Sequence, residues 1–142
     1  MRTPAAGAVA MAVAVAFSAP ALAAEAMSKA QYAVARKSIE SDFRTARVGC
    51  EPMLANVKDI CLADVTGREG VALAELEALY VPGTSSLQGV RIAKARAIHA
   101  LALEKCDDKA PSARQACVKD ADAANVAARA AEGPVRVDAK RL

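Results

Sequence analysis

The four cysteines of this chain fall into two pairs with the same spacing. Residues 50–61 read CEPMLANVKDIC and residues 106–117 read CDDKAPSARQAC, so ten residues separate the members of each pair. In a continuous helix the two cysteines of a pair would lie roughly 16 Å apart, since each residue rises about 1.5 Å. Because a disulfide needs Cα atoms within about 7 Å, a turn must separate two cysteines that bond to each other. The spacing therefore predicts two helical hairpins, each closed at its tip.

Four cysteines allow three pairings. We favour Cys50 with Cys61 and Cys106 with Cys117, because a unit that carries its own pair needs no cysteine from the other half. Each bond would add about 2.5 to 3 kcal/mol by restricting the unfolded chain. A four-cysteine zinc site is the alternative, but structural zinc ligands usually lie about two to four residues apart within a pair. Haem attachment and redox-active pairs normally use a Cys-x-x-Cys spacing, which this sequence lacks.

The likeness of the two segments extends beyond their cysteines. With the segments in register at a period of 56 residues, most of the polar positions match in type. The matched pairs are Glu51 with Asp107, Asn56 with Ser112, Lys58 with Arg114, Asp59 with Gln115, and Asp64 with Asp120. The sequence therefore predicts an internal repeat whose unit is a helix, a short loop and a returning helix.

The N-terminus has the order of a secretory signal peptide. Arg2 precedes a small and apolar run from Pro4 to Leu22, and the run ends in Ala21-Leu22-Ala23. We expect cleavage after Ala23. A membrane anchor is the alternative, but the run consists mostly of alanine, barely reaches spanning length and has small residues at the cleavage positions. A lipid anchor is not expected, because no cysteine lies at the cleavage point.

The mature chain, residues 24–142, has almost no charge bias. It carries 18 basic and 16 acidic side chains, a net charge of +2, and it has no tryptophan, two tyrosines and one phenylalanine. Without a basic run or a set of aromatic residues for base stacking, nucleic acid is not an expected partner. No second apolar stretch is long enough to span a bilayer, so we expect no transmembrane segment in the mature chain. Export to a bacterial periplasm fits both the signal and the paired cysteines, because disulfides persist there.

An alanine-rich composition with many Lys, Arg, Glu and Leu residues favours helix. We predict four helices, over about 29–49, 57–79, 87–105 and 113–132, with a stop at Gly133-Pro134. Three predicted N-terminal caps pair Ser28 with Gln31, Asn56 with Asp59, and Ser112 with Gln115. Gly67 and Gly70 weaken the second helix by about 1 kcal/mol each relative to alanine, so fraying or a bend is expected there unless they allow close helix contact.

The expected fold class is all-α, with two tandem disulfide-clamped helical hairpins packed as a four-helix bundle. The expected organisation is a signal peptide (1–23), hairpin repeat 1 (24–80), a linker (81–89) with Pro82 and two glycines, hairpin repeat 2 (90–133) and a flexible tail (134–142). The hairpins are expected to pack together, because isolated hairpins would leave the larger apolar residues poorly covered. These residues are Ile39, Phe43, Leu76, Ile98 and Leu101.

A set of residues resembles a known group of proteins. The pattern C…N-x-K-D-[IV]-C occurs here as Cys50, Asn56, Lys58, Asp59 and Cys61, followed by AELEA at 74–78 and then by Tyr80 and Pro82. This pattern resembles a group of uncharacterised exported bacterial alanine-rich helical proteins with twin C-x10-C repeats, some of which are labelled as cell-envelope biogenesis or Tol-like proteins. The resemblance implies a location in the envelope and a helical architecture, and it carries no catalytic residue over.

The sequence offers little for chemistry. The one histidine, His99, lies among alanines in the third predicted helix, and motifs for an activated nucleophile or a phosphate loop are missing. We therefore predict no catalytic residue, no cofactor and no metal. The expected function is that of a non-enzymatic exported protein, an envelope-associated structural or protein-interaction component, whose partner is an envelope protein or a second copy of itself. The alternatives are a periplasmic carrier of a small ligand or metal, with a cavity between the hairpins, and a holdase that offers an apolar helix face to unfolded proteins.

Overall fold

The computed structural model describes residues 26–130, and these residues form four helices connected by short loops. The helices are α1 (Lys29–Val48), α2 (Ala55–Tyr80), α3 (Thr84–Glu104) and α4 (Pro111–Ala130). Nothing in this part of the chain is a strand. The all-α class predicted from the sequence is therefore confirmed.

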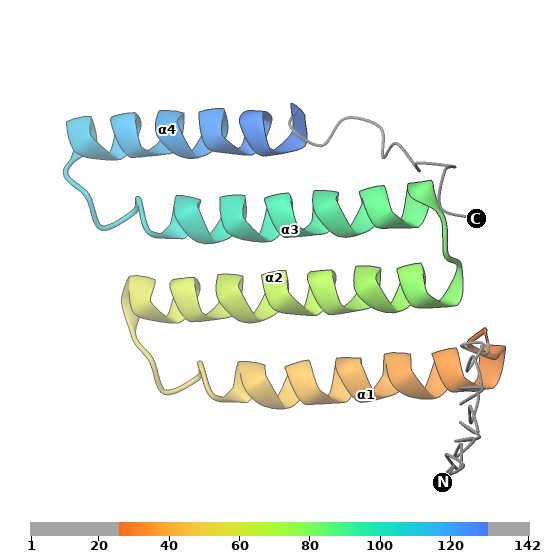
Figure 1. Ribbon diagram of the computed structural model, residues 1–142. Helices are drawn as coiled ribbons and strands as arrows, with labels where there is room; N and C mark the ends of the chain where they lie inside the picture. The colour runs from red at the N-terminus through yellow and green to blue at the C-terminus, as the bar shows by residue number, and fades with distance from the viewer. Residues whose placement is uncertain (1–25, 131–142) are drawn as a thin grey trace, which may run out of the picture.

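The four helices lie side by side in the order of the chain (Figure 1). Helix α1 packs on α2, α2 on α3 and α3 on α4, and no other pair of helices is in contact within residues 26–130. The result is an up-and-down bundle that is open between α1 and α4. The most extensive of the three interfaces joins α2 to α3, so the two hairpins pack together as predicted.

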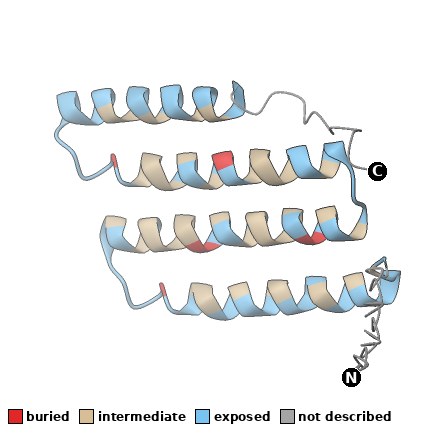
Figure 2. Ribbon diagram, viewed as in Figure 1, coloured by how far each residue is buried: buried red, intermediate tan, exposed pale blue. Residues whose placement is uncertain are grey.

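The core of this arrangement is small. The buried residues of the described chain are Cys50, Val65, Leu76, Ala95 and Cys106, and Figure 2 shows them scattered among half-buried and exposed positions. Both edge helices, α1 and α4, have one neighbour each and contain no buried residue. The expectation that packing of the hairpins would cover Ile98 is wrong, because this side chain is 69% exposed.

Helix α1 begins as its sequence predicts. Ser28 is its N-cap and accepts a hydrogen bond from the backbone N–H of Gln31 at 3.2 Å, while the Gln31 side chain accepts from the Ser28 N–H at 2.8 Å. This reciprocal pair is a capping box, which gives partners to two N–H groups that the helix itself leaves free.

The other two predicted caps are wrong. The N-cap of α2 is Leu54, which makes no side-chain hydrogen bond, so Asn56 lies inside the helix. Helix α4 begins at Pro111, which places Ser112 in its first turn and not at its cap. Proline suits the first position of a helix, because it has no N–H to leave unpaired and its φ angle is already helical.

The break between the hairpins is shorter than the linker expected over 81–89. Only residues 81–83 separate α2 from α3, and residues 84–89 form the first turns of α3. Helix α2 also runs through Gly67 and Gly70 without interruption, so the helix does not fray there. A Cβ on Gly67 would lie 2.8 Å from the Cβ of Ala97, and this glycine therefore allows the close approach of α2 and α3.

Several predictions fall outside the described residues. These are the signal peptide with its cleavage after Ala23, the Gly133-Pro134 stop, and the tail over 134–142. Among the helices of residues 26–130, none combines the length and the apolar character that a membrane crossing requires.

Candidate functional site

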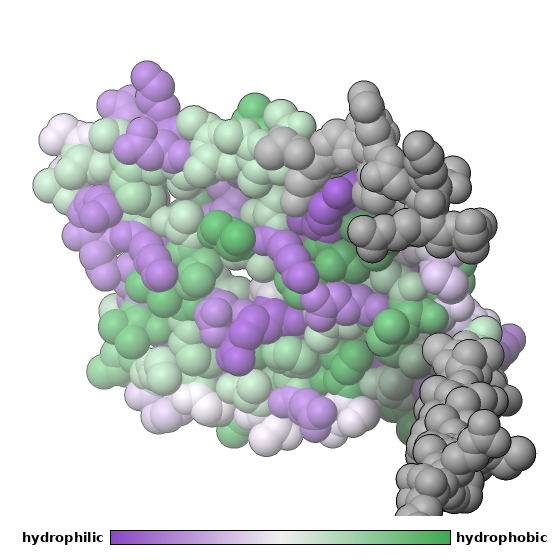
Figure 3. All heavy atoms as spheres, viewed as in Figure 1, coloured by the Kyte–Doolittle hydropathy of each residue, from purple (hydrophilic) through white to green (hydrophobic). Residues whose placement is uncertain are grey.

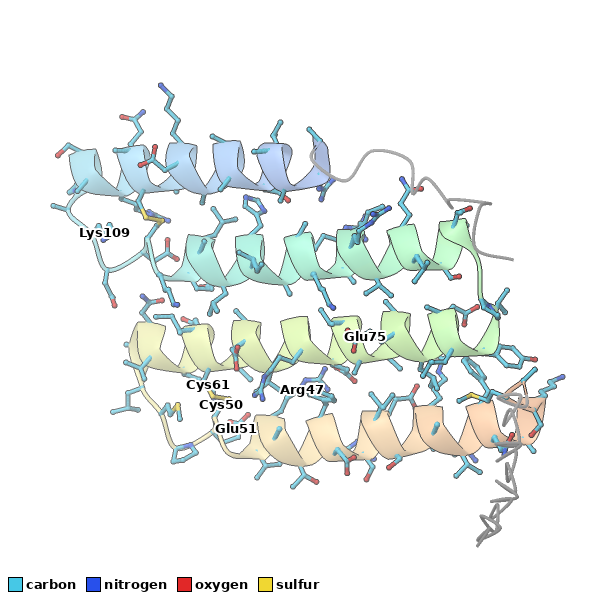
Figure 4. All side chains as sticks on the ribbon, in the orientation of Figure 1. Arg47, Cys50, Glu51, Cys61, Glu75 and Lys109 are labelled. Atoms are coloured by element: carbon cyan, nitrogen blue, oxygen red, sulfur yellow. A yellow bond between two sulfur atoms is a disulfide. The ribbon has the colours of Figure 1, made fainter. Side chains whose placement is uncertain are left out.

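Both disulfides lie at the same end of the bundle. Cys50 bonds to Cys61 between α1 and α2, and Cys106 bonds to Cys117 between α3 and α4, each with a Cα–Cα distance of 5.7 Å. Figure 4 shows Cys50 and Cys61 at this end, with Lys109 in the neighbouring loop. The predicted pairing within each half is confirmed. Each bond closes the turn that the cysteine spacing requires.

The same contacts surround the two disulfides. Lys58 lies 2.7 Å from a carboxylate oxygen of Glu51, and Arg114 lies 2.7 Å from a carboxylate oxygen of Asp107. These are residues that the 56-residue register places in equivalent positions. Each ion pair joins the start of the loop to the first turns of the returning helix. The two hairpin ends are therefore built on the same covalent and ionic frame.

The loops on this common frame differ in chemistry. In the first hairpin the loop carries Met53, which is 36% exposed, and Leu54, which is 82% exposed. The corresponding positions in the second hairpin are Lys109 and Ala110. We call residues 52–55 of the first hairpin the apolar tip. In the sequence, the apolar tip is visible as two large apolar residues after Pro52, whereas the second segment has a lysine and an alanine at these positions. The predictions from sequence did not single out this difference.

The backbone of the apolar tip has one unusual residue. Ala55, which follows Leu54, has φ of 50°, and it is the only described residue other than glycine with a positive φ. L-residues with a side chain seldom adopt this left-handed region, which costs of order 1 kcal/mol, and such positions often occur at binding sites. The surrounding structure therefore holds the backbone next to Leu54 in a conformation that the isolated loop would not favour.

A second feature is a groove of about 270 Å³ between α2 and α3. It is mainly apolar, and two of its lining residues, Ile98 and Leu101, come from one face of α3. The complete lining is Asp64, Arg68, Val71, Ala72, Glu75, Ala97, Ile98 and Leu101. Because Gly67 and Ala97 bring the two helices together beside it, the groove is shallow and open to solvent.

Two ion pairs border this groove. Arg68 contacts Asp64 one turn away on α2 at 3.0 Å, and Lys94 of α3 contacts Glu75 of α2 at 2.8 Å. Figure 4 labels Glu75 on α2, away from the disulfide end. Figure 3 shows hydrophobic side chains over α2 and α3, interrupted by hydrophilic side chains. All four charged groups remain partly exposed, so each pair by itself stabilises the fold by about 1 kcal/mol or less.

Helical spacing extends the groove into a longer surface. On α2, steps of seven and four residues connect Val57, Asp64, Arg68, Glu75 and Leu79, and on α3 the same steps connect Leu87, Lys94 and Ile98. Residues at these steps share one side of a helix. The apolar members are exposed by 60% (Val57), 65% (Leu79), 48% (Leu87) and 69% (Ile98). We call these eight residues, together with the groove, the groove face.

His99 has a partner that the sequence did not indicate. Its Nε2 atom lies 2.7 Å from Oδ1 of Asp122, across the interface of α3 and α4. Asp122 is 60% exposed, so the contact lies at the surface. Within residues 26–130, no group of three His, Cys, Asp or Glu side chains is arranged to hold a metal ion. The His99–Asp122 contact joins α3 to α4.

At the end of the first hairpin opposite its disulfide, Tyr32 of α1 meets two residues of α2. Its hydroxyl donates a hydrogen bond to Glu77 at 2.8 Å, and its ring stacks on Tyr80 with centroids 4.5 Å apart. The bond to the Glu77 carboxylate raises the pKa of Tyr32 above its ordinary value, and partial desolvation adds to the rise. This contact joins the two helices where no disulfide does.

Comparisons with protein-family models, with curated proteins and with solved structures found no match to this chain. The two features that expose large apolar side chains, the apolar tip and the groove face, are the candidate sites. Because exposed apolar surface is typical of interaction sites, both are candidates for binding.

Proposed function

We propose that this chain is a non-enzymatic protein exported to the periplasm, which acts as an interaction component of the cell envelope by presenting its apolar tip to another protein. The observation that carries this proposal is the position of Leu54. It is the most exposed large hydrophobic residue of the described chain, at 82%. It lies in the loop between Cys50 and Cys61, which are joined by a disulfide.

The rigidity of the loop favours binding. Burial of an exposed leucine in an apolar pocket is worth about 1.5 to 3 kcal/mol. A mobile loop would lose part of this gain to ordering, whereas the bond between Cys50 and Cys61 and the ion pair between Glu51 and Lys58 already fix the ends of the loop. Leu54 is 82% exposed and lies next to the left-handed backbone of Ala55. The apolar tip is thus preorganised for binding.

The chemistry of the tip indicates the kind of partner. Met53 and Leu54 together offer a small apolar knob, and the paired charges of Glu51 and Lys58 lie beside it. Binding hot spots have this form, with an apolar centre that is desolvated and a polar rim that stays hydrated. The partner is therefore a folded protein with a concave apolar pocket about the size of one or two side chains.

Two arguments support the location. The sequence begins with the order of a signal peptide, and two disulfides are most stable in an oxidising compartment such as the periplasm.

The internal repeat also fits this proposal. Two copies with the same disulfide and the same ion pair provide a stable frame, and the change from Lys109 and Ala110 to Met53 and Leu54 makes one of the two tips apolar.

Site-specific photo-cross-linking in intact expressing cells tests the proposal. A photoreactive amino acid at position 54 is compared with the same amino acid at position 110, its equivalent in the second hairpin. We expect a discrete covalent adduct with another protein at position 54 and none at position 110. The Leu54→Ser substitution, in a chain that carries the photoreactive group at position 53, should abolish the adduct. Equal labelling at both tips, or no adduct at position 54, would refute the role of the apolar tip.

A further inference from the structure

We propose that the groove face of α2 and α3 is the interface of a homodimer with two-fold symmetry. This inference is independent of the apolar tip, which lies at the end of the bundle. It starts from the row of helices: each of α2 and α3 has neighbours on two sides, and the groove face between them is covered by no part of residues 26–130. Domains usually bury such faces between two layers, and a second copy would supply the missing layer.

The apolar content of the face suits a dimer. Four large side chains project from it, Val57, Leu79, Leu87 and Ile98, and they lie along the full length of α2 and much of α3. Single exposed apolar residues are ordinary, but several of them beside an apolar groove, with paired charges between them, form a surface of the kind that marks interaction sites.

The area of the face is also sufficient. Helix α2 has 26 residues, which corresponds to a length of about 39 Å. Two helices packed about 9 Å apart, each about 10 Å wide, present a face about 19 Å across. Helix α3 has 21 residues and is about 32 Å long. The footprint is therefore about 670 Å², within the range of roughly 600 to 1,000 Å² that each partner buries in a stable complex. Together α2 and α3 can form a complete interface without help from the edge helices.

The charges on the face are already paired within each copy. Asp64 is paired with Arg68, and Glu75 is paired with Lys94. Removal of one partner of such a pair would leave a buried charge uncompensated, but an intact pair enters the interface with its main electrostatic partner in place. The carboxylates of the groove are therefore compatible with a second copy above them.

The pair of Glu75 and Lys94 also gives the dimer its register. The two residues come from different helices and meet across the groove. A two-fold axis along the groove exchanges the positions of α2 and α3, so it places Glu75 of one copy over Lys94 of the other, and the reverse. The four charges then alternate in sign around the axis. Complementary charges at an interface fix its register and disfavour other arrangements.

Sedimentation of the oxidised mature chain over a range of concentrations tests the dimer. We expect a dimer that dissociates on dilution, and the Ile98→Asp substitution should raise its dissociation constant at least about tenfold, which corresponds to about 1.4 kcal/mol. The matched control is Val126→Asp on α4, because Val126 has nearly the same exposure (67%) and lies outside the groove face. Circular dichroism confirms that both variants fold. A wild-type chain that stays monomeric, or a dimer equally weakened by both substitutions, would overturn the proposal.

A mixing experiment with two charge-reversal variants tests the register. Glu75→Lys places four positive charges around the axis of its own dimer, and Lys94→Glu places four negative charges there, so each variant alone should be monomeric. In a mixed dimer, the new lysine at position 75 of one copy faces the new glutamate at position 94 of the other, and the second contact is the native pair. We expect the mixture of the two variants to dimerise. Two variants that remain monomeric when mixed would exclude the two-fold arrangement along the groove.

Discussion

Asn56 of α2 donates a hydrogen bond from its Nδ2 to the backbone carbonyl of Glu104, the last residue of α3, at 2.9 Å. The bond crosses between the two hairpins at their disulfide ends. The same carbonyl also accepts from the N–H of Asp107 at 3.2 Å. Because the last carbonyls of a helix have no partner within it, Asn56 acts as a C-terminal cap for α3. A residue predicted to begin one helix therefore helps to end another.

Substitution of Asn56 should weaken the contact between the hairpins. Asn56→Ala removes the bond, and we expect a loss of about 1 kcal/mol in the free energy of unfolding. Asn56→Asp should cost more, because an ionised carboxylate cannot donate and would face the carbonyl oxygen of Glu104. Urea unfolding measures both effects. The control is Asn125→Asp, since Asn125 accepts a hydrogen bond from Arg129 and a carboxylate can do the same. An Asn56→Asp variant as stable as the wild type would contradict this role.

The two disulfides should contribute equally to stability. Replacement of Cys50 and Cys61 by alanine, or of Cys106 and Cys117 by alanine, should each lower the free energy of unfolding by about 3 kcal/mol, because the loops that they close have the same length. Much of the helical circular dichroism should survive in each variant, since the interface of α2 and α3 contains neither bond. Thermal and urea unfolding check the size of the loss. A large loss for one pair and none for the other would contradict the common frame.

Gly67 and Gly70 should respond to alanine in opposite directions. Alanine gains about 1 kcal/mol in helix propensity at either position. At Gly67 the new Cβ would lie 2.8 Å from that of Ala97, so α2 and α3 must separate and overpacking should outweigh the gain by about 1 kcal/mol or more. At Gly70 no atom lies within 4 Å of the new Cβ, and the substitution should stabilise the protein. Urea unfolding of the two variants gives the signs. A Gly67→Ala variant more stable than the wild type would show that the helices do not approach closely there.

The bond from Tyr32 to Glu77 should shift the titration of the tyrosine. In a Tyr80→Phe background, where Tyr32 is the one remaining tyrosine, absorbance should give a pKa above the ordinary value of 10.0. Adding Glu77→Gln should lower that pKa, because the negative partner is lost. A pKa raised in the folded state means that the stabilisation is complete below the ordinary pKa and is lost as the pH rises through the folded value. Identical titration of Tyr32 before and after the Glu77→Gln substitution would contradict the contact.

The sequence was most informative where a constraint is local or covalent. The spacing of Cys50 and Cys61 predicted a hairpin because the length of a disulfide admits few alternatives, and the cap of Ser28 and Gln31 was predicted because all of its atoms lie within one helical turn. The 81–89 segment was misread because Gly83 and the serines also suit the first turn of a helix. Its composition alone did not fix where α3 begins.

Long-range relationships were outside the reach of sequence patterns. Asn56 suits a helix N-cap by residue type, and only the packing of α3 against α2 gives it the carbonyl of Glu104. Ile98 has the character of a core residue, but the helices pack in a row, and no other helix of residues 26–130 covers its side of α3. The exposure of Leu54 follows from the conformation of a single loop, to which helical periodicity does not apply.

Intact-mass spectrometry of the chain purified from a periplasmic extract, with and without thiol alkylation, is the decisive measurement for export and for the two disulfides. We expect a chain that begins at Ala24 and lacks four hydrogens because of its two disulfides, with no alkylation before reduction. Tryptic peptides should then be linked within residues 50–61 and within 106–117. A chain that retains residues 1–23, free thiols, or a link between the two halves would contradict an exported protein built on two self-contained hairpins.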